Sequence, residues 1–228
     1  MVRYALVPVA VKPRSRPYNA RRRQAAASRR RQTILAAATR LFLERGYLAT
    51  TMTDIAVEAG VALDTIYALA GRKPRLFRLL IETAISGTDL PVDPEARDYV
   101  IAIHAESDPA RKLELYANAI VAIHARLAPL IRVLSIAAAA DAELAGIWGE
   151  IAERRARNMR LLVRELEASG ALREDLSVDE AADILWALNA PEFYLLLVAE
   201  RGWDPERYGK WLADAWQRLL LKYLEPGM

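Results

Sequence analysis

The chain has 228 residues, of which 54% are hydrophobic, 27% charged and 7% aromatic. This composition excludes a wholly disordered chain, because such a chain lacks the apolar residues needed to offset the entropy of ordering. Cysteine is absent and histidine occurs only as His104 and His124. Disulfides, thiol nucleophiles and multi-histidine metal sites are therefore excluded, and we expect neither a metal nor a cofactor.

The formal net charge of +3 hides a strong asymmetry. Residues 1–45 contain twelve Lys and Arg and one acid, Glu44, a net charge of +11 that leaves −8 for the other residues. Because Pro8, Pro13 and Pro17 separate clusters of arginine, residues 1–28 are predicted to form a disordered basic arm. A basic end on an acidic body favours a polyanionic partner, although such a segment can also serve solubility alone.

No segment is predicted to enter a membrane. The longest apolar runs have about ten residues, fewer than the roughly 18 of a membrane-spanning helix. The apolar stretch at residues 4–11 is interrupted by Pro8 and followed by basic residues, unlike a secretion signal. We therefore expect a soluble cytoplasmic protein with no membrane partner.

Hydrophobic spacing beyond Ser28 is helical throughout, which predicts an all-α fold. The turn-forming residues 87–94 divide it into an N-terminal domain, residues 29–89, and a C-terminal domain, residues 90–228. Expected helices of the first domain cover residues 29–45, 52–59, 62–67 and 75–86. Those of the second cover residues 95–106, 110–127, 129–140, 142–169, 178–199 with a kink at Pro191, and 205–224.

Two short helices joined by a glycine turn form a helix-turn-helix pattern at residues 53–67. Thr51 and Asp54 have the spacing of a capping box that opens the first of them. Ala56 and Ala59 are small enough for close helix packing, and Gly60 suits the tight turn. In such a motif the second helix lies in the major groove of DNA.

Residues 30–89 resemble the DNA-binding domain of the tetracycline-repressor (TetR) family. The residues that carry the resemblance, in matching order and spacing, are Ile34, Ala37, Ala38, Leu41, Phe42, Gly46, Tyr47, Thr51, Asp54-Ile55-Ala56, Ala59-Gly60-Val61, Thr65-Ile66-Tyr67 and Lys73. Residues 181–188 and 200–203 are similar to the regulatory domain of the same family. The resemblance implies a homodimeric transcriptional regulator, commonly a repressor, that binds a palindromic double-stranded DNA operator and is released by a small-molecule effector.

The matched positions and their chemistry suggest the DNA contacts. Hydroxyl groups at a helix N-terminus and a lysine suit phosphate, whereas the start of the second helix suits base edges. The expected DNA-binding residues are Thr51, Thr53, Ala62, Leu63, Asp64, Thr65, Tyr67 and Lys73. A pure helix cap is the alternative for Thr51, and packing between helices is the alternative for Tyr67.

The sequence departs from the family pattern in the second helix of the motif. Ala62 stands where the family has a small polar cap, Asp64 replaces an unobtrusive residue, and Leu69-Ala70 replaces a His-Phe pair. The helix offers no Arg, Lys, Asn or Gln for base recognition. A dimeric helical ligand-binding protein with little operator specificity is therefore the alternative function.

The C-terminal domain supplies candidates for dimerisation and effector binding. An apolar stripe on the last helix suggests half of an intersubunit four-helix bundle, or otherwise ordinary core: Trp211, Leu212, Ala215, Trp216, Leu219 and Leu220. An effector cavity is expected to be apolar with few polar groups. Its candidates, each of which could instead be core or surface, are His104, His124, Trp148, Met159, Trp186, Asn189 and Tyr194. Glycine-rich phosphate loops and hydrolase motifs do not occur, so we expect no enzymatic activity.

Overall fold

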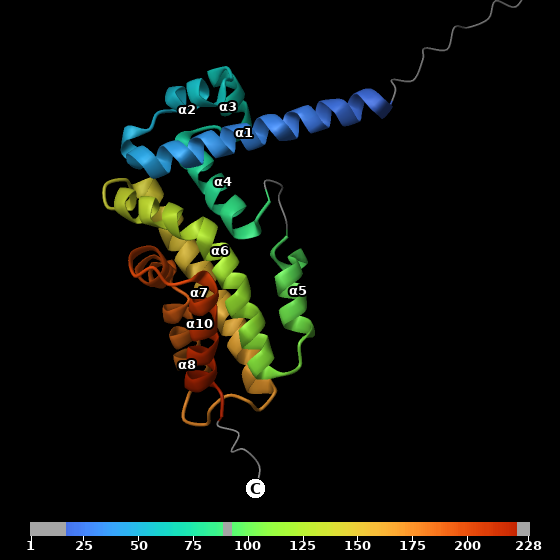
Figure 1. Cartoon of the computed structure of the whole chain (residues 1–228), viewed down its shortest axis with the longest axis vertical. Helices are drawn as coiled ribbons and strands as arrows, with labels where there is room; N and C mark the ends of the chain where they lie inside the picture. The colour runs from blue at the N-terminus through green and yellow to red at the C-terminus, as the bar shows by residue number, and fades with distance from the viewer. Residues whose placement is uncertain (1–16, 89–92, 223–228) are drawn as a thin grey trace, which may run out of the picture.

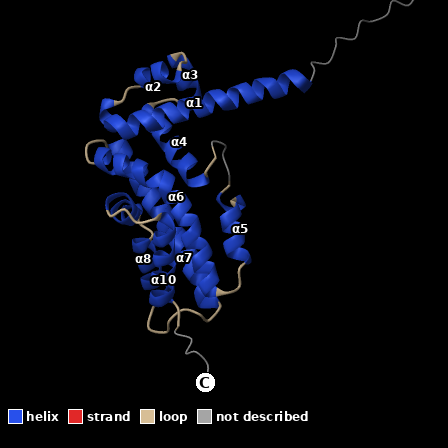
Figure 2. Ribbon diagram, viewed as in Figure 1, coloured by secondary structure: helices blue, strands red, loops and turns tan. Residues whose placement is uncertain are grey.

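The structure is a computed structural model that describes residues 17–88 and 93–222. Within these residues the fold is all-α, as predicted. Leu172 and Leu221 form an isolated β-bridge. The helix-turn-helix region lies at one end of an elongated bundle (Figures 1 and 2).

The first helix is longer than the sequence predicted. Helix α1 (Pro17–Ala49) begins twelve residues before the expected start at residue 29 and projects well beyond the rest of the domain (Figure 1). The prediction of a disordered arm is therefore wrong for residues 17–28, and residues 1–16 lie outside the described residues. Proline is tolerated at the first helical position, and the alanines and arginines that follow are strong helix formers. Gly46, at φ 78°, interrupts the helix where a stop was expected.

The local signals of the helix-turn-helix are confirmed. Thr51 and Asp54 form both bonds of the capping box at the start of α2 (Met52–Ala59). Gly60 ends this helix in the left-handed conformation, at φ 62°. Helix α3 (Leu63–Ala70) follows, and its N-cap residue Ala62 makes no side-chain capping bond, as the sequence indicated. Helix α4 (Lys73–Ser86) begins two residues before the expected start at residue 75, with Pro74 in its first turn.

The long helices of the second domain form the body of the bundle. A short 3-10 segment, η1 (Pro94–Ala96), and α5 (Asp98–Ala105) precede α6 (Pro109–Ala138) and α7 (Ala142–Ala168). The expectation of two helices at residues 110–127 and 129–140 is wrong, because α6 continues through Pro129. Buried Leu127, Leu130 and Ile131 hold both sides of the proline against the core, so packing outweighs the lost backbone hydrogen bond.

The helix expected at residues 178–199 is divided. Helix α8 (Val178–Leu188) starts at the expected residue 178, after a capping box formed by Ser177 and Glu180, and its C-cap is Asn189. After a break at Ala190 the chain forms α9 (Pro191–Tyr194) and a π-helical segment, η2 (Leu195–Glu200). Pro191 thus starts a new helix and does not merely kink the old one, as its fixed backbone angle allows. Helix α10 (Pro205–Leu220) then packs along α6 and α8.

The last helix buries half of the residues expected to form a dimer interface. Leu212, Trp216 and Leu220 are completely buried within the single chain, and the Trp216 ring stacks on Tyr116 of α6. Their expected dimerisation role is therefore wrong, since a side chain in the subunit core cannot contact a partner. Trp211, Ala215 and Leu219 remain partly or largely exposed along α10.

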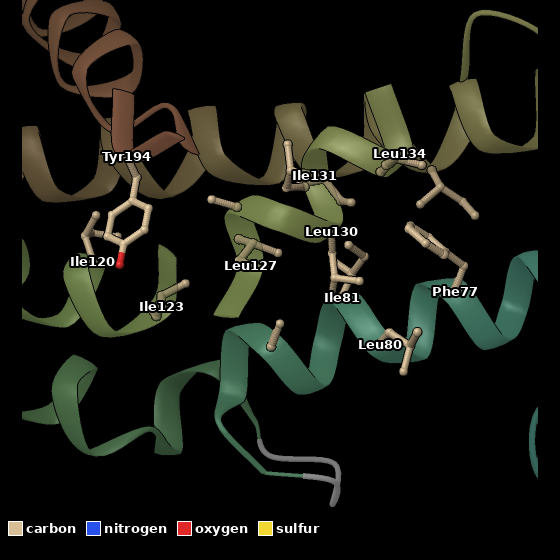
Figure 3. Packing of buried hydrophobic residues seen from close by; sticks show 14 of the residues in the cluster. Phe77, Leu80, Ile81, Ile120, Ile123, Leu127, Leu130, Ile131, Leu134 and Tyr194 are labelled. Atoms are coloured by element: carbon tan, nitrogen blue, oxygen red, sulfur yellow. The ribbon is translucent and has the colours of Figure 1, made fainter. Parts of the chain in front are cut away.

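One hydrophobic core runs through both domains. Phe77, Leu80 and Ile81 of α4 face the α6 segment that carries Leu130 and Leu134 (Figure 3). The end of α1 also packs on α6. The DNA-binding domain is therefore joined to the bundle by buried apolar side chains as well as by the chain itself.

Two stretches, Pro109–Ala138 and Val178–Glu200, are long and apolar enough to cross a membrane by length and composition. The first stretch is longer than the apolar runs of about ten residues that were inferred from the sequence. It is the central helix of the bundle, with contacts to α1, α4, α7 and α10, and core helices commonly meet the same criterion. Among the described residues, the length and composition of these two stretches are therefore only a weak indication of a membrane-spanning helix.

We predict that Pro129→Ala stabilises the protein. Alanine restores the backbone donor within α6, so the free energy of unfolding should rise by about 1–3 kcal/mol. Urea denaturation followed by circular dichroism measures the change. Pro109→Ala is the matched control, because Pro109 occupies the first turn of the same helix, where proline costs little. A Pro129 variant less stable than the parent would contradict the packing argument.

Candidate nucleic-acid interface and ligand cavity

The helix-turn-helix presents a small polar surface to the solvent. Thr53, Ala62, Asp64 and Tyr67 are exposed, and Tyr67 retains 47% of its accessible surface. Thr65 is partly buried, and so is Leu63, which packs against the core and offers less of its side chain to a base. The structure therefore brings together most of the predicted contact residues on the outer side of α2 and α3.

Thr51 and Lys73 already have intramolecular partners. The Thr51 hydroxyl donates to Asp54 Oδ2 at 2.7 Å and accepts from the Asp54 amide at 3.1 Å, which is its capping role. Lys73 Nζ donates to the carbonyl groups of Tyr47 and Thr50, both at 2.9 Å, and lies 4.1 Å from the Tyr47 ring centroid. Burial lowers the pKa of Lys73. The lysine thus fastens the end of α1 to the start of α4.

An aromatic cluster fixes the orientation of the motif. Phe42 lies 5.5 Å from Tyr47 and 5.1 Å from Phe77, measured between ring centroids. Buried Thr50 donates to the Gly46 carbonyl at 2.8 Å, which holds the loop before α2. These contacts belong to α1 and α4, so they support α2 and α3 without occupying the exposed surface.

The predicted effector residues are divided among three adjoining cavities. Arg97, Arg154 and Arg155 line the arginine cavity, together with the predicted His124, Met159 and Asn189. His104 lines the Glu165 cavity, which shares Met159 with the first. Trp148 and Trp186 line the tryptophan cavity, which shares Arg155. Tyr194 lines none of these three and packs edge-on against the His124 ring, at 6.1 Å between centroids.

The arginine cavity concentrates buried polar atoms that have no hydrogen-bond partner. Among the described residues seven buried side-chain nitrogen and oxygen atoms lack one, and five of these belong to residues that line this cavity. They are Arg97 Nε, His124 Nδ1, Arg154 Nη2, Arg155 Nε and Asn189 Oδ1. Buried polar atoms are normally hydrogen-bonded, so this cavity is suited to a polar occupant.

The environment of His124 keeps the imidazole neutral. The side chain is 2% exposed, and burial, assisted by the nearby positive charge of Arg155, lowers its pKa to about 3. Asn189 donates to the Tyr116 hydroxyl at 2.8 Å. Burial also raises the pKa of Tyr116. All three side chains are therefore uncharged at neutral pH, and the arginines supply the positive charge of the cavity.

Polar contacts connect the cavity region to α4. Arg154 Nη1 donates to Glu82 at 2.8 Å, and Arg126 donates to the Ala84 carbonyl at 3.0 Å. Arg78 pairs with Glu150 of α7. Because α4 directly follows α3, these contacts tie the recognition helix to the walls of the cavity.

A tri-helical unit with a capped α2, a glycine turn and an exposed α3 defines a helix-turn-helix DNA-binding domain. Residues 34–80 match the family model described as "Bacterial regulatory proteins, tetR family". The HTH-type transcriptional repressor BepR of Brucella suis biovar 1 (strain 1330) is 29% identical over 176 residues, 75% of this chain and 82% of that protein. Residues 34–80 therefore form a DNA-binding domain of the TetR type, and the chain is similar to DNA-binding transcriptional regulators of that family.

Solved structures share the whole fold. The crystal structure of native NalD, the secondary repressor of the MexAB-OprM multidrug efflux pump in Pseudomonas aeruginosa, superposes with a TM-score of 0.67 at 24% identity. The alignment covers 88% of this chain and all of that one. The fatty acid degradation regulator FadR from Bacillus halodurans gives 0.64 at 20% identity, covering 82% and 94% of the two chains. At these identities the likeness concerns the fold.

Sequence reasoning missed the three arginines of the cavity. Arg154 and Arg155 lie in a helix rich in alternating charge, where a solvated face is the ordinary interpretation. Burial of Arg155 depends on α8 and α9, which lie on the far side of a turn. Trp186 and Asn189, whose carbonyl groups hold Arg155, lie far from it in the sequence, so no local pattern indicated the contact.

We predict that His124 makes the protein less stable in mild acid. The unfolded state binds a proton on this histidine below about pH 6.5, whereas the folded state does so only near pH 3. The free energy of unfolding should therefore fall from pH 6.5 to 4.5 by about 1.4 kcal/mol per pH unit at most. His124→Gln should flatten this dependence in urea titrations at each pH. His104→Gln, at an exposed position, should retain it; equal slopes for the His124 variant and the parent would contradict the prediction.

Proposed function

We propose that the protein is a homodimeric repressor that binds a palindromic operator and is released by a small-molecule effector. The observation that carries the proposal is the exposed helix-turn-helix surface on a domain that matches the TetR family model. The resemblance to a transcriptional repressor supports the sign of regulation. The following contacts support each part.

Operator contact is assigned to α2 and α3. Thr53 at the start of α2 and the exposed Tyr67 hydroxyl are placed to donate to phosphate. Asp64 lies exposed in the first turn of α3, where its carboxylate can accept from the amino group of cytosine. Thr51 contributes through the helix N-terminus that it caps, and Lys73 by holding α4 beneath the motif.

The helical extension of α1 adds positive charge to the same end of the molecule. Arg22, Arg23, Arg29 and Arg30 are exposed on this helix. Contacts with phosphate from such side chains release counterions and make binding salt-dependent without specifying sequence. In this proposal the extension strengthens binding, whereas α3 selects the site.

Dimerisation is assigned to the face of α8 and α10 that remains outside the subunit core. Ile184 and Leu188 are only partly buried on α8, as are Trp211 and Ala215 on α10. Leu219, 40% exposed, extends the α10 stripe by one further turn. Helices α8 and α10 are in contact, and in this proposal the side chains form one apolar surface that two-fold symmetry pairs with itself.

Release is assigned to the connection between the cavities and α4. An occupant that shifts α6 or α7 also shifts the partners of Glu82 and Ala84 on α4. Such a shift changes the spacing of the two recognition helices in a dimer, which favours a state with low DNA affinity.

The test of operator binding is a fluorescence-anisotropy titration with DNA from beside the gene and with scrambled DNA of equal length. We expect a preference of about a thousandfold that declines with salt. Tyr67→Phe should weaken binding by about threefold to tenfold, the value of one hydrogen bond. Tyr208→Phe, which removes a buried hydroxyl of α10 that has no hydrogen-bond partner, is the matched control. Equal and weak binding to both DNAs would instead favour the ligand-binding dimer without operator specificity.

The dimer is tested by Leu219→Glu. A carboxylate buried within an apolar interface should weaken association at least tenfold, or about 1.4 kcal/mol. Sedimentation velocity over a range of protein concentrations measures the change. Ile101→Glu alters a similarly exposed apolar residue on α5 and should leave the association constant unchanged. Equal association of both variants would place the interface elsewhere.

A further inference from the structure

We propose that the arginine cavity binds an organic monoanion, an apolar body bearing one carboxylate, with Arg155 as the counter-ion. The inference rests on the proposed function, because it names the chemical class of the effector. It depends on three features of the cavity: a guanidinium without an ion-pair partner, the absence of acids from the cavity's own lining, and apolar walls of limited size.

Arg155 forms no ion pair with a carboxylate among the described residues, and the acid that acts on its charge, Glu192, lies in the lining of the adjoining tryptophan cavity. Its Nη2 donates to the carbonyl groups of Trp186, at 2.9 Å, and Asn189, at 2.8 Å. The guanidinium also lies 5.0 Å from the Trp186 ring. These contacts fix the side chain in place while its buried Nε lacks a partner.

An arginine stays protonated in a protein, so the charge persists even though burial lowers the pKa of Arg155. Buried charges are ordinarily paired, because the cost of removing them from water is large. A bound anion would supply the missing charge and accept the free Nε–H.

The remaining charged groups of the lining have the same sign. Arg97 and Arg154 line the cavity, each with one buried unpartnered nitrogen, and no acid is among the described lining residues. Glu165 lines the neighbouring cavity, where Lys112 pairs with it at 2.6 Å and His104 at 2.8 Å. Glu82 lies on the far side of Arg154 and engages only its Nη1. The cavity therefore favours an anion and disfavours a cation.

The walls limit the size of the apolar body. Ile120, Ile123, Leu127, Ile151 and Pro191 line the arginine cavity, whose volume is about 120 Å³. The Glu165 cavity adds a similar volume and shares Tyr99, Tyr116 and Met159 with it. Benzene occupies an engineered apolar cavity of about 150 Å³, so a single ring or a chain of comparable length is the appropriate scale.

The same site is suited to transmit binding. The Arg154 side chain lines the cavity; one terminal nitrogen of its guanidinium donates to Glu82 of α4, and the other is buried without a partner. A carboxylate that accepts from this second nitrogen competes with Glu82 for the arginine. Binding of the anion thus weakens a contact that holds α4 against α7.

The experiment is calorimetric titration of the full chain with three matched series: benzoate, hexanoate and octanoate, their primary amides, and the corresponding amines. We expect at least one carboxylate to bind tenfold or more tightly than its amide and amine. Arg155→Gln should abolish that preference, whereas Arg155→Lys should retain part of it. Arg164→Gln, an exposed arginine on the same helix outside these cavities, should leave it intact. Circular dichroism verifies that each variant is folded.

Three results would overturn the proposal. The first is that no carboxylate binds at concentrations up to about 10 mM, which is beyond the range of weak specific affinities. The others are equal binding of all three series and a preference for carboxylates that persists in Arg155→Gln. Operator titration in parallel separates this proposal from the function on which it rests. Specific DNA binding without carboxylate binding refutes the effector class alone. Carboxylate binding with equal affinity for operator and scrambled DNA refutes the regulator and leaves the anion site standing.

Discussion

The packing of α4 against α6 is the interaction on which the rest of the structure depends. Phe77, Leu80 and Ile81 bury one side of α4 in the bundle, while its N-terminal end supports the aromatic cluster beneath the helix-turn-helix (Figure 3). Because these contacts are apolar and closely packed, α4 cannot move without a response from α6. The same helix thus supports α3 at one end and packs along α6, a helix that lines the arginine cavity.

The features that the sequence predicted well are those whose cause is local. The capping box at Thr51 and the glycine turn at Gly60 depend on residues within four positions of one another, and each was confirmed. Their combination was enough to identify the helix-turn-helix. The unfavourable start of α3 at Ala62 was equally visible, because a missing cap is a property of one residue.

The features that the sequence could not predict depend on contacts between distant segments. Pro129 remains inside α6 because the bundle buries both of its flanks, and Trp216 is core because α10 lies along α6. Glu150 and Arg154 have the spacing of an intrahelical pair. Glu150 nevertheless pairs with Arg78 of α4, and Arg154 pairs with Glu82 of the same helix. In each case the local pattern allowed two outcomes, and tertiary packing selected one.

Arginine is the residue that such reasoning places least well, because its long side chain can cross from a solvated face to a buried one. Arg154 and Arg155 are adjacent in α7, yet one holds α4 and the other holds the break between α8 and α9. Both side chains line a single cavity, and each has a buried nitrogen without a hydrogen-bond partner. An anion that accepts from these nitrogens would bind the state in which the two arginines converge. Whatever weakens the hold of Arg154 on Glu82 must then act on α4, and α4 carries the recognition helix. In the proposed mechanism, the charge of the cavity and the control of the DNA-binding surface therefore depend on the same two side chains.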